Sequence, residues 1–251
     1  MEGRIIMKFK TENKSFREDL KILIDKLKTK EPFSFSKYAD GELHILSNKP
    51  INNGEFWFNP KENQEFRKQM IESFRFKNEN YFVGISCPCC IGGLTVHNWL
   101  KKQSGQELTN LTWANLFVNG NHKHYLDKMV PHYSEFEVVL VSNSASNLDS
   151  LPFDVSKHFQ IGKNAWVDNN ELISEVKDFI TTEEIKDNLF LFCAGPFGNI
   201  LAHQLFEFNS QNTYIDIGST LNHYLLGEAG KTRGYLRNEP TINKICVWSD
   251  K

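Results

Sequence analysis

Two short segments of this chain are apolar at nearly every position, and they restrict its fold more than any other feature. Residues 136–141 end in Val-Val-Leu-Val, and residues 189–193 read Leu-Phe-Leu-Phe-Cys. A strand with one face in water alternates apolar and polar residues, whereas a strand buried on both faces is continuously apolar. Both segments are therefore predicted to be inner strands of a parallel sheet.

Helical and extended patterns alternate along the rest of the chain. Leu20, Leu23, Ile24 and Leu27 form an apolar stripe at helical spacing, which predicts an amphipathic helix. The predicted helices are 14–29, 61–76 (opened by Pro60), 91–102, 168–181, one from the turn 194–199 through Phe206, and 221–226; the remaining predicted strands are 32–38, 81–85, 158–161 and 213–217. This repetition is typical of a doubly wound α/β sheet. We predict a mostly parallel, Rossmann-like sheet in a single domain, residues 1–251.

The composition argues against several classes of partner. The net charge is −2 and the pI is about 6.5, with lysines interspersed among acidic residues, so no basic surface for nucleic acid is predicted. The N-terminal segment has no apolar core of signal-peptide length, and no stretch approaches the roughly 20 apolar residues that span a bilayer. We therefore expect a cytoplasmic protein without a transmembrane segment. The oligomeric state is not predicted.

The cysteines do not predict a disulfide scaffold, because there are five and two of them, Cys193 and Cys246, lie alone in apolar runs. Cys87, Cys89 and Cys90 are clustered, and Cys87 and Cys90 have the spacing of zinc ligands. No second ligand pair follows them. A redox pair at a helix start is the other alternative. Small residues packed at a strand-to-helix turn are the favoured interpretation.

The turn after the first predicted strand carries two carboxylates, in Asp40-Gly41-Glu42. Open α/β sheets bind ligands at the carboxyl ends of their strands, and a glycine lets backbone or ligand approach closely. Two carboxylates there suit a divalent cation that carries a phosphorylated substrate. The alternative is structural, with Asp40 as a helix N-cap and Glu42 as a first-turn acid that complements the helix dipole.

Three further turns follow predicted strands and should meet the first at the same edge of the sheet. They are Ser142-Asn143-Ser144, Gly195-Pro196-Phe197-Gly198-Asn199 and Asp216-Ile217-Gly218-Ser219. The second resembles a turn that binds phosphate with the free N–H groups of a helix N-terminus. It has no P-loop lysine and no G-x-G-x-x-G pattern, so a tight strand-to-helix connection is an equal alternative.

The order of these motifs resembles that of the GT-D type glycosyltransferases, a family formerly called a domain of unknown function. Residues 37–42, Lys-Tyr-Ala-Asp-Gly-Glu, resemble its R-F-G-D-G-E signature. Residues 161–166 resemble its P-x-x-N-A-W segment, residues 194–202 its G-P-T-A-x-x-L-A turn and helix, and residues 214–219 its A-L-D-I-G-H strand end. The resemblance spans residues 32–226. Lys37, Ala39 and Ser219 depart from the family pattern, and the departures put donor identity and the catalytic base in doubt.

The resemblance implies transfer of a sugar from a nucleotide donor, in particular a UDP-sugar, to a hydroxyl of a glycan acceptor. It implies that Asp40 and Glu42 hold Mn²⁺ or Mg²⁺, and that cofactor or donor contacts come from the motif residues. These residues are Tyr38, Gly41, Asn164, Trp166, Gly195, Pro196, Asn199, Gly218 and Ser219. Departure of a nucleoside diphosphate needs a cation and oriented N–H donors, which such turns can supply.

A general base and stacking groups are less closely defined. An inverting reaction needs a base for the acceptor hydroxyl, and Asp216 at a strand end is the first candidate, with helix capping as its alternative. His223 and Glu228 are further candidates without a spacing argument. Tyr38 and Trp166 adjoin motif residues and are predicted to stack on sugar or base rings. His122 and His124 are expected on a solvated helix, with metal ligation as the alternative. Lys231, Arg233 and Arg237 are expected on the solvated surface, with acceptor or diphosphate binding as the alternative.

Two other functions remain open. An S-adenosylmethionine-dependent methyltransferase also has a doubly wound sheet, but its glycine-rich loop normally follows the first strand, whereas Gly195 comes late in this chain. A non-catalytic, glycan-binding relative would keep the fold without the chemistry. The intact pair Asp40 and Glu42 argues against that alternative.

Overall fold

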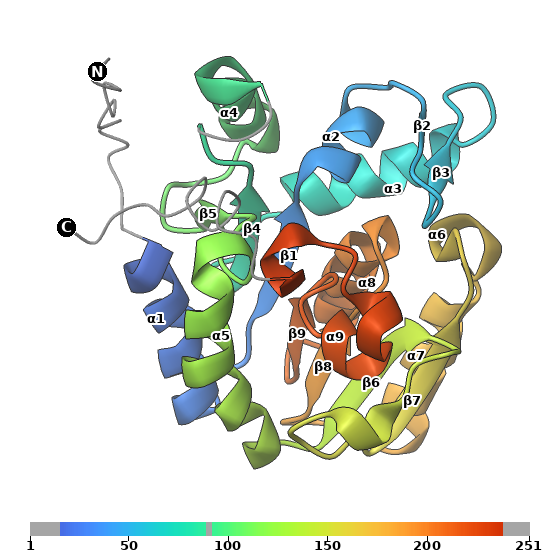
Figure 1. Cartoon of the computed structure of the whole chain (residues 1–251). Coiled ribbons are helices and arrows are strands. Elements are labelled where there is room, and N and C mark those ends of the chain that lie inside the picture. Colours follow the sequence, from blue (N-terminus) through green and yellow to red (C-terminus); the bar gives the residue numbers. More distant parts are fainter. Residues whose placement is uncertain (1–15, 89–91, 238–251) are drawn as a thin grey trace.

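The computed structural model describes residues 16–88 and 92–237, and within these ranges a seven-stranded parallel sheet forms the centre of the molecule (Figure 1). Its strand order is β5-β4-β1-β9-β8-β6-β7. The strands are β1 (Ser34–Tyr38), β4 (Tyr81–Ile85), β5 (Leu111–Trp113), β6 (Val138–Asn143), β7 (Lys157–Ile161), β8 (Leu189–Phe192) and β9 (Thr213–Asp216). The predicted α/β fold with a parallel sheet is confirmed, and β6 and β8 are inner strands as their apolar sequences predict.

Helices follow most strands. They are α1 (Phe16–Thr29), α2 (Asp40–Leu46), α3 (Gln64–Arg75), α4 (Gly93–Ser104), α5 (His122–Lys128), α6 (Ala165–Asp168), α7 (Leu172–Thr182), α8 (Pro196–Phe208) and α9 (Asn222–Leu225). Pro60 does not open α3, which was the prediction. Asn59 accepts hydrogen bonds from the backbone N–H of Lys61 and Asn63, and this turn delays the helix to Gln64.

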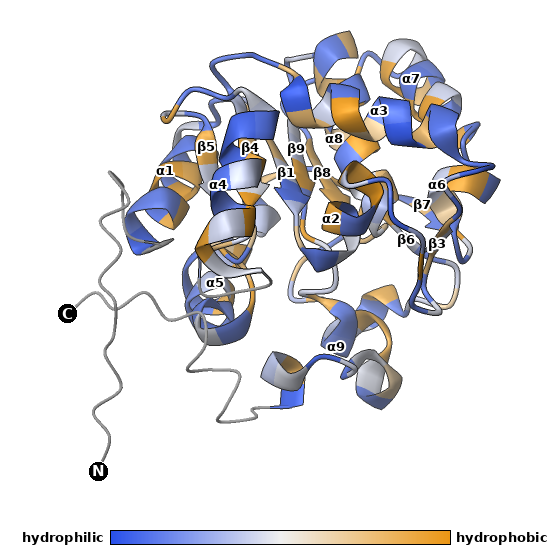
Figure 2. Ribbon diagram, turned by 90° about the horizontal axis from the view of Figure 1, so that it is seen from above, coloured by the Kyte–Doolittle hydropathy of each residue, from blue (hydrophilic) through white to orange (hydrophobic). Residues whose placement is uncertain are grey.

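The two faces of the sheet carry separate apolar layers. One layer is formed mainly by α3, α7 and α8, which lie together on one side of the strands (Figure 2), and the other includes α1 and α5. Large aromatic side chains fill both layers, since Phe35, Phe74, Tyr125 and Trp166 are each at most 1% exposed. His122 of α5 belongs to the second layer at 8% exposure, so the predicted solvated position is wrong for this residue.

A hairpin and one strand lie in segments for which no element was predicted. The small antiparallel hairpin, β2 (Ile51–Asn52) with β3 (Trp57–Phe58), sits between α2 and α3. The strand is β5, and α5 follows it where a helix was predicted at His122 and His124. Within the described ranges, no helix is long and apolar enough to cross a membrane.

The first strand has late elements of the chain beside it. β1 pairs with β4 on one side and with β9 on the other. The strands of this sheet that follow β1 directly, β4 and β5, extend the sheet on one side of it, and the later strands β6 to β9 form the other side. In doubly wound sheets a crevice opens at the carboxyl ends of the strands where the order reverses in this way. The turns after β1, β9, β8, β6 and β7 therefore share one edge.

Of the predicted cysteine cluster, the structure describes Cys87 alone. Its side chain is buried and its sulfur accepts a hydrogen bond from Asn115 Nδ2 at 3.4 Å. Cys89, Cys90 and Cys246 lie outside the described residues.

Candidate active site

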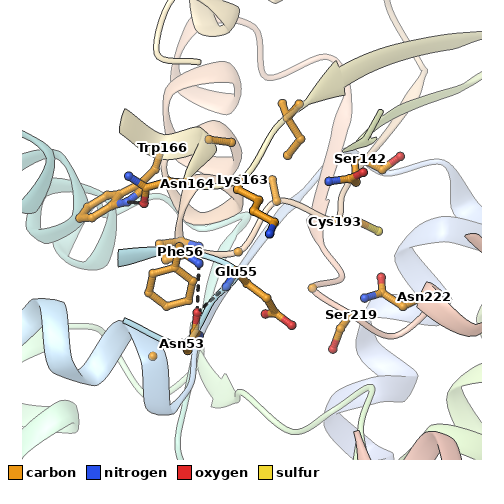
Figure 3. Close-up of a pocket in the computed structure, with 18 of the residues that line it drawn as sticks. Asn53, Glu55, Phe56, Ser142, Lys163, Asn164, Trp166, Cys193, Ser219 and Asn222 are labelled. Atoms are coloured by element: carbon orange, nitrogen blue, oxygen red, sulfur yellow. Dashed lines mark hydrogen bonds between the residues drawn. The ribbon is translucent and has the colours of Figure 1, made fainter. Parts of the chain in front are cut away.

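A pocket of about 430 Å³ opens at the shared edge of the sheet. Its wall comes from the turns after β1, β6, β7, β8 and β9, and from the β2–β3 hairpin, which approaches from the side (Figure 3). Most of the predicted site residues line it, namely Asp40, Gly41, Glu42, Asn164, Trp166, Gly195, Pro196, Gly218 and Ser219. Four motifs far apart in the sequence thus meet in one cavity.

The first turn of α2 separates the roles of its two carboxylates. Helix α2 starts at Asp40, and its N-cap is Ala39. Glu42 is buried, and its Oε2 accepts the backbone N–H of Ala39 at 2.9 Å, which is the reciprocal half of a capping box. Asp40 is exposed to the pocket and has no ion-pair or hydrogen-bond partner among the described residues. The N-cap alternative for Asp40 is therefore wrong, and its carboxylate is available to a ligand.

Lys37, at the end of β1, places an ammonium group at the floor of the pocket. A Cβ on Gly218 would lie 3.2 Å from Lys37 Nζ, so the glycine, at φ +52°, leaves room for this group. Burial alone would lower the pKa of Lys37, but the carboxylates of Glu42 and Asp216 outweigh it and hold the pKa above its ordinary value. Lys37 is charged at neutral pH and balances the acids around it.

Asp216 lies beneath the pocket and is not one of its lining residues. It is 2% exposed, and its two oxygens accept the backbone N–H of Lys37 at 3.2 Å and of Gly218 at 3.1 Å. Burial raises the pKa of Asp216 to about 7, while the ammonium of Lys37 opposes the rise. The observed contacts join the end of β1 to the turn after β9. A catalytic role for Asp216 stays a prediction.

Phe56 of the hairpin fills the space between two glycine turns. A Cβ on Gly41 would lie 2.7 Å from Phe56 Cζ, and one on Gly195 would lie 3.6 Å from Phe56 Cδ1. Gly195 also has φ +54° with ψ −139°, a backbone conformation that is strongly unfavourable for residues other than glycine. The ring of Phe56 explains the glycine at 41, and the backbone conformation explains the glycine at 195, in both cases without a ligand.

Asn164 fixes the turn after β7 to the same hairpin. Its Oδ1 accepts hydrogen bonds from Trp57 N and from Trp166 Nε1, both at 2.9 Å, and its own backbone N–H donates to Glu55 O at 3.0 Å. Asn164 is 1% exposed and has φ +51°, a left-handed conformation that asparagine tolerates better than most residues. Asn164 thus holds the hairpin in place as part of the pocket wall.

Several predicted contacts are not available to a ligand. Tyr38 is fully buried and packs on Phe74, with ring centroids 4.6 Å apart, and Trp166 is 1% exposed between Phe58 and Phe66. The predicted stacking roles of Tyr38 and Trp166 are wrong, because both rings belong to the core. Asn199 is also fully buried, and the predicted donor contact is replaced by hydrogen bonds from its Nδ2 to Ser36 Oγ and Lys37 O.

The two further base candidates also lie away from the pocket wall. His223 is half-buried next to His122, and desolvation by burial lowers its pKa to about 4. Glu228 is at the surface, where it pairs with Lys231. Neither residue lines the pocket.

Other lining residues had weaker sequence signals. Ser142 belongs to one of the turns that were predicted to meet at the edge of the sheet, and its hydroxyl forms a hydrogen bond with His158 Nε2 at 2.8 Å. Asn222 lines the pocket and was not predicted. Arg233 pairs with Glu55 of the hairpin at 3.0 Å. Arg233 belongs to the basic group for which acceptor or diphosphate binding was the alternative prediction, and it lines the pocket.

The chain resembles known proteins in structure and not in sequence. No family model and no curated protein matches it. Two solved structures match it. One is described as a new glycosyltransferase (DUF1792) from Streptococcus sanguinis and has a TM-score of 0.55. The other is described as domain of unknown function 1792 with a distinct glycosyltransferase fold and has a TM-score of 0.56. They are 16% and 15% identical, and cover 82% and 84% of this chain and 81% and 79% of their own. A selenomethionine structure of the same domain matches with a TM-score of 0.55 at 16% identity, over 84% of this chain and 79% of that one. The chain therefore has the DUF1792 glycosyltransferase fold, which is the GT-D fold that its motifs predicted.

Proposed function

We propose that this protein is a metal-dependent glycosyltransferase that moves a sugar from a nucleotide-sugar donor, UDP-linked, to a hydroxyl of a glycan acceptor. One observation carries the proposal. The carboxylate of Asp40 has no structural task in the helix cap and faces a pocket at the edge of the sheet. The fold that presents it is shared with a solved protein described as a glycosyltransferase.

The donor set fits a hard divalent cation. Asp40 and Glu42 offer carboxylate oxygens in the first turn of α2, which follows β1 directly. One oxygen of Glu42 already accepts the backbone N–H of Ala39. No group of three or more His, Cys, Asp or Glu side chains in residues 16–88 and 92–237 is placed to hold a metal ion by itself. Mg²⁺ and its analogues are commonly bound by one or two carboxylates together with substrate phosphates. Mn²⁺ or Mg²⁺ would thus be held by Asp40, Glu42 and the donor together.

The reaction breaks the bond between the anomeric carbon and the diphosphate oxygen, forms a bond from that carbon to the acceptor oxygen, and releases the proton of the acceptor hydroxyl to a base or to the solvent. The bonding electrons leave with the nucleoside diphosphate, and the metal would supply positive charge for it. Lys37 adds a permanent positive charge at the pocket floor, because its ammonium stays protonated beside Glu42 and Asp216. The pocket of about 430 Å³ lies in the range of small-ligand sites.

Calorimetric titration tests this proposal. The purified protein is titrated with UDP, GDP, CMP and S-adenosylmethionine, each with and without Mn²⁺, and then mixed with the UDP-sugar and a glycan acceptor to detect the transferred sugar. Asp40→Asn keeps the size of the side chain and removes its charge, and Asp178→Asn on the exposed surface of α7 is the matched control. Mn²⁺-dependent UDP binding that Asp40→Asn loses and Asp178→Asn keeps supports the proposal. Binding of S-adenosylmethionine alone contradicts it.

A further inference from the structure

The charges that line the pocket are not all balanced by one another. Its basic side chains within the described residues, histidine aside, are Lys37, Lys163 and Arg233. Arg233 is paired with Glu55. Neither Lys37 nor Lys163 has a carboxylate within ion-pair distance in the part of the chain that the structure describes. Lys37 is nevertheless tied to the acids beneath the pocket, because its backbone N–H donates to Asp216 Oδ2 at 3.2 Å and the charges of Glu42 and Asp216 act on its ammonium. We therefore take Lys163 as the lining cation that is available to a ligand.

Lys163 is held at the pocket wall by its neighbour in the chain. The Asn164 side chain is 1% exposed, and its Oδ1 accepts hydrogen bonds from Trp57 N and Trp166 Nε1. These contacts restrain the backbone of the turn after β7. The lysine side chain extends from this fixed turn toward the centre of the cavity (Figure 3). A lysine on a restrained turn loses less freedom on binding than one on a mobile loop.

The free anion of the pocket complements this free cation. Asp40 faces the cavity from the turn after β1, and Lys163 faces it from the turn after β7, at the other end of the group of strands that form the pocket. A ligand that satisfies both must bring a cation to Asp40 and an anion to Lys163. A metal-bound diphosphate has this distribution of charge, because the metal binds carboxylates and the phosphate oxygens accept hydrogen bonds from an ammonium.

We propose that Lys163 binds a phosphate group of the donor, so that the diphosphate lies across the pocket between the carboxylates of α2 and the turn after β7. This inference rests on the proposed function and specifies how the same site holds its substrate. Ser142, Asn143 and Asn222 also line the pocket, and their hydroxyl and amide groups are suited to sugar or ribose hydroxyls.

The test measures binding both with a chelator and with saturating Mn²⁺, so that the effect of the lysine is separated from that of the metal ligands. Pyrophosphate, UDP, GDP and uridine are titrated under each condition into the wild-type protein, Lys163→Gln and Lys163→Arg. We expect Lys163→Gln to weaken UDP and pyrophosphate roughly tenfold to a hundredfold, as is typical for loss of a charged hydrogen bond. Uridine affinity should not change, and Lys163→Arg should recover most of the loss. Lys102→Gln on exposed α4 is the control for a change in net charge.

Each result has a definite meaning. Equal affinity of Lys163→Gln and the wild type for UDP and pyrophosphate contradicts this inference and leaves the proposed function standing if Mn²⁺ still strengthens UDP binding. An equal loss in Lys102→Gln also contradicts it, because the effect would then be one of net charge. A wild-type protein that binds none of the diphosphates, with or without Mn²⁺, contradicts both the inference and the proposed function. Thermal unfolding of each variant excludes misfolding as the cause.

Discussion

The phenyl ring of Phe56 occupies the space that a side chain on Gly41 would need, with Phe56 Cζ 2.7 Å from the position of a Cβ on residue 41. Gly41 lies between the two carboxylates of α2, and Phe56 is only 6% exposed. The contact is a structural explanation for the glycine of the Asp-Gly-Glu motif. It also means that the hairpin and the carboxylate turn are positioned by one another.

We predict that Gly41→Ala lowers the free energy of unfolding by about 1–3 kcal/mol, the usual cost of forcing an extra carbon into a packed site. The residue is helical and its φ is not positive, so backbone strain does not contribute. Urea unfolding measures the change. In a Phe56→Ala background the same substitution should instead stabilise by about 0.5–1 kcal/mol, because alanine favours a helix over glycine. Equal effects of Gly41→Ala in the two backgrounds would contradict this account of the contact.

Asn164→Ala should destabilise the protein by roughly 2–4 kcal/mol, because Trp57 N–H loses its side-chain acceptor, Trp166 Nε1 keeps only Trp57 O, and alanine is strained at φ +51°. Asn48→Ala is a matched control, since Asn48 has φ +57° on the exposed surface and its side chain accepts one exposed hydrogen bond. The control shares the backbone strain, so a larger loss for Asn164 measures the buried bonds. Similar losses in the two variants would argue that strain alone matters.

His223 should make the protein less stable in mild acid. Burial lowers its pKa to about 4, and the ring of His122 and the charge of Lys231 act in the same direction. As the pH falls, His223 of the unfolded chain binds a proton near pH 6.5, whereas His223 of the folded chain binds one only near pH 4. The free energy of unfolding therefore decreases between about pH 6.5 and about pH 4, and the contribution of neutral His223 is fully present above that range. His223→Gln should lose less stability between pH 7 and pH 5 than the wild type. Parallel curves of unfolding free energy against pH would contradict the prediction.

The ion pair between Glu55 and Arg233 should contribute little to stability. Both side chains are about half exposed, at 53% and 45%, and exposed pairs are typically worth between 0 and about 1 kcal/mol. Glu55→Gln is therefore expected to change the melting temperature only slightly, and 0.5 M salt should have the same small effect on the wild type. A large destabilisation would mean that this pair holds the hairpin, in place of Asn164 and Phe56.

The sequence predicted the fold well because burial of the strands leaves a direct mark on composition. β6 and β8 are apolar at successive positions, and four motifs in a fixed order placed their turns along one edge. The hairpin was not predicted, since two-residue strands carry too few residues for any periodicity. α5 was predicted as a solvated helix from its two histidines. His122 is instead buried, and its Nε2 forms a hydrogen bond with Thr220 O at 3.0 Å.

The site was predicted in outline and not at the level of single contacts. Residues on the outer surface of the turns, such as Asp40 and Ser219, do line the pocket. Tyr38 and Asn199 come from the same motifs, but strand and helix geometry direct their side chains into the core. One position along a strand reverses the side of the sheet that a residue faces, and sequence motifs do not specify that direction.

The pairing of β1 with β9 also governs when this protein can fold. The backbone N–H of Lys37 reaches Asp216 Oδ2 across a separation of 179 residues in the chain. A ribosome releases β1 before the other strands of this sheet, and its second neighbour, β9, emerges only after β4, β5, β6, β7 and β8. Contacts between such distant segments slow folding, because a long loop must close before they form. The carboxylate turn therefore waits for β9 before the pocket around it exists, and β1 has an unpaired edge during that time.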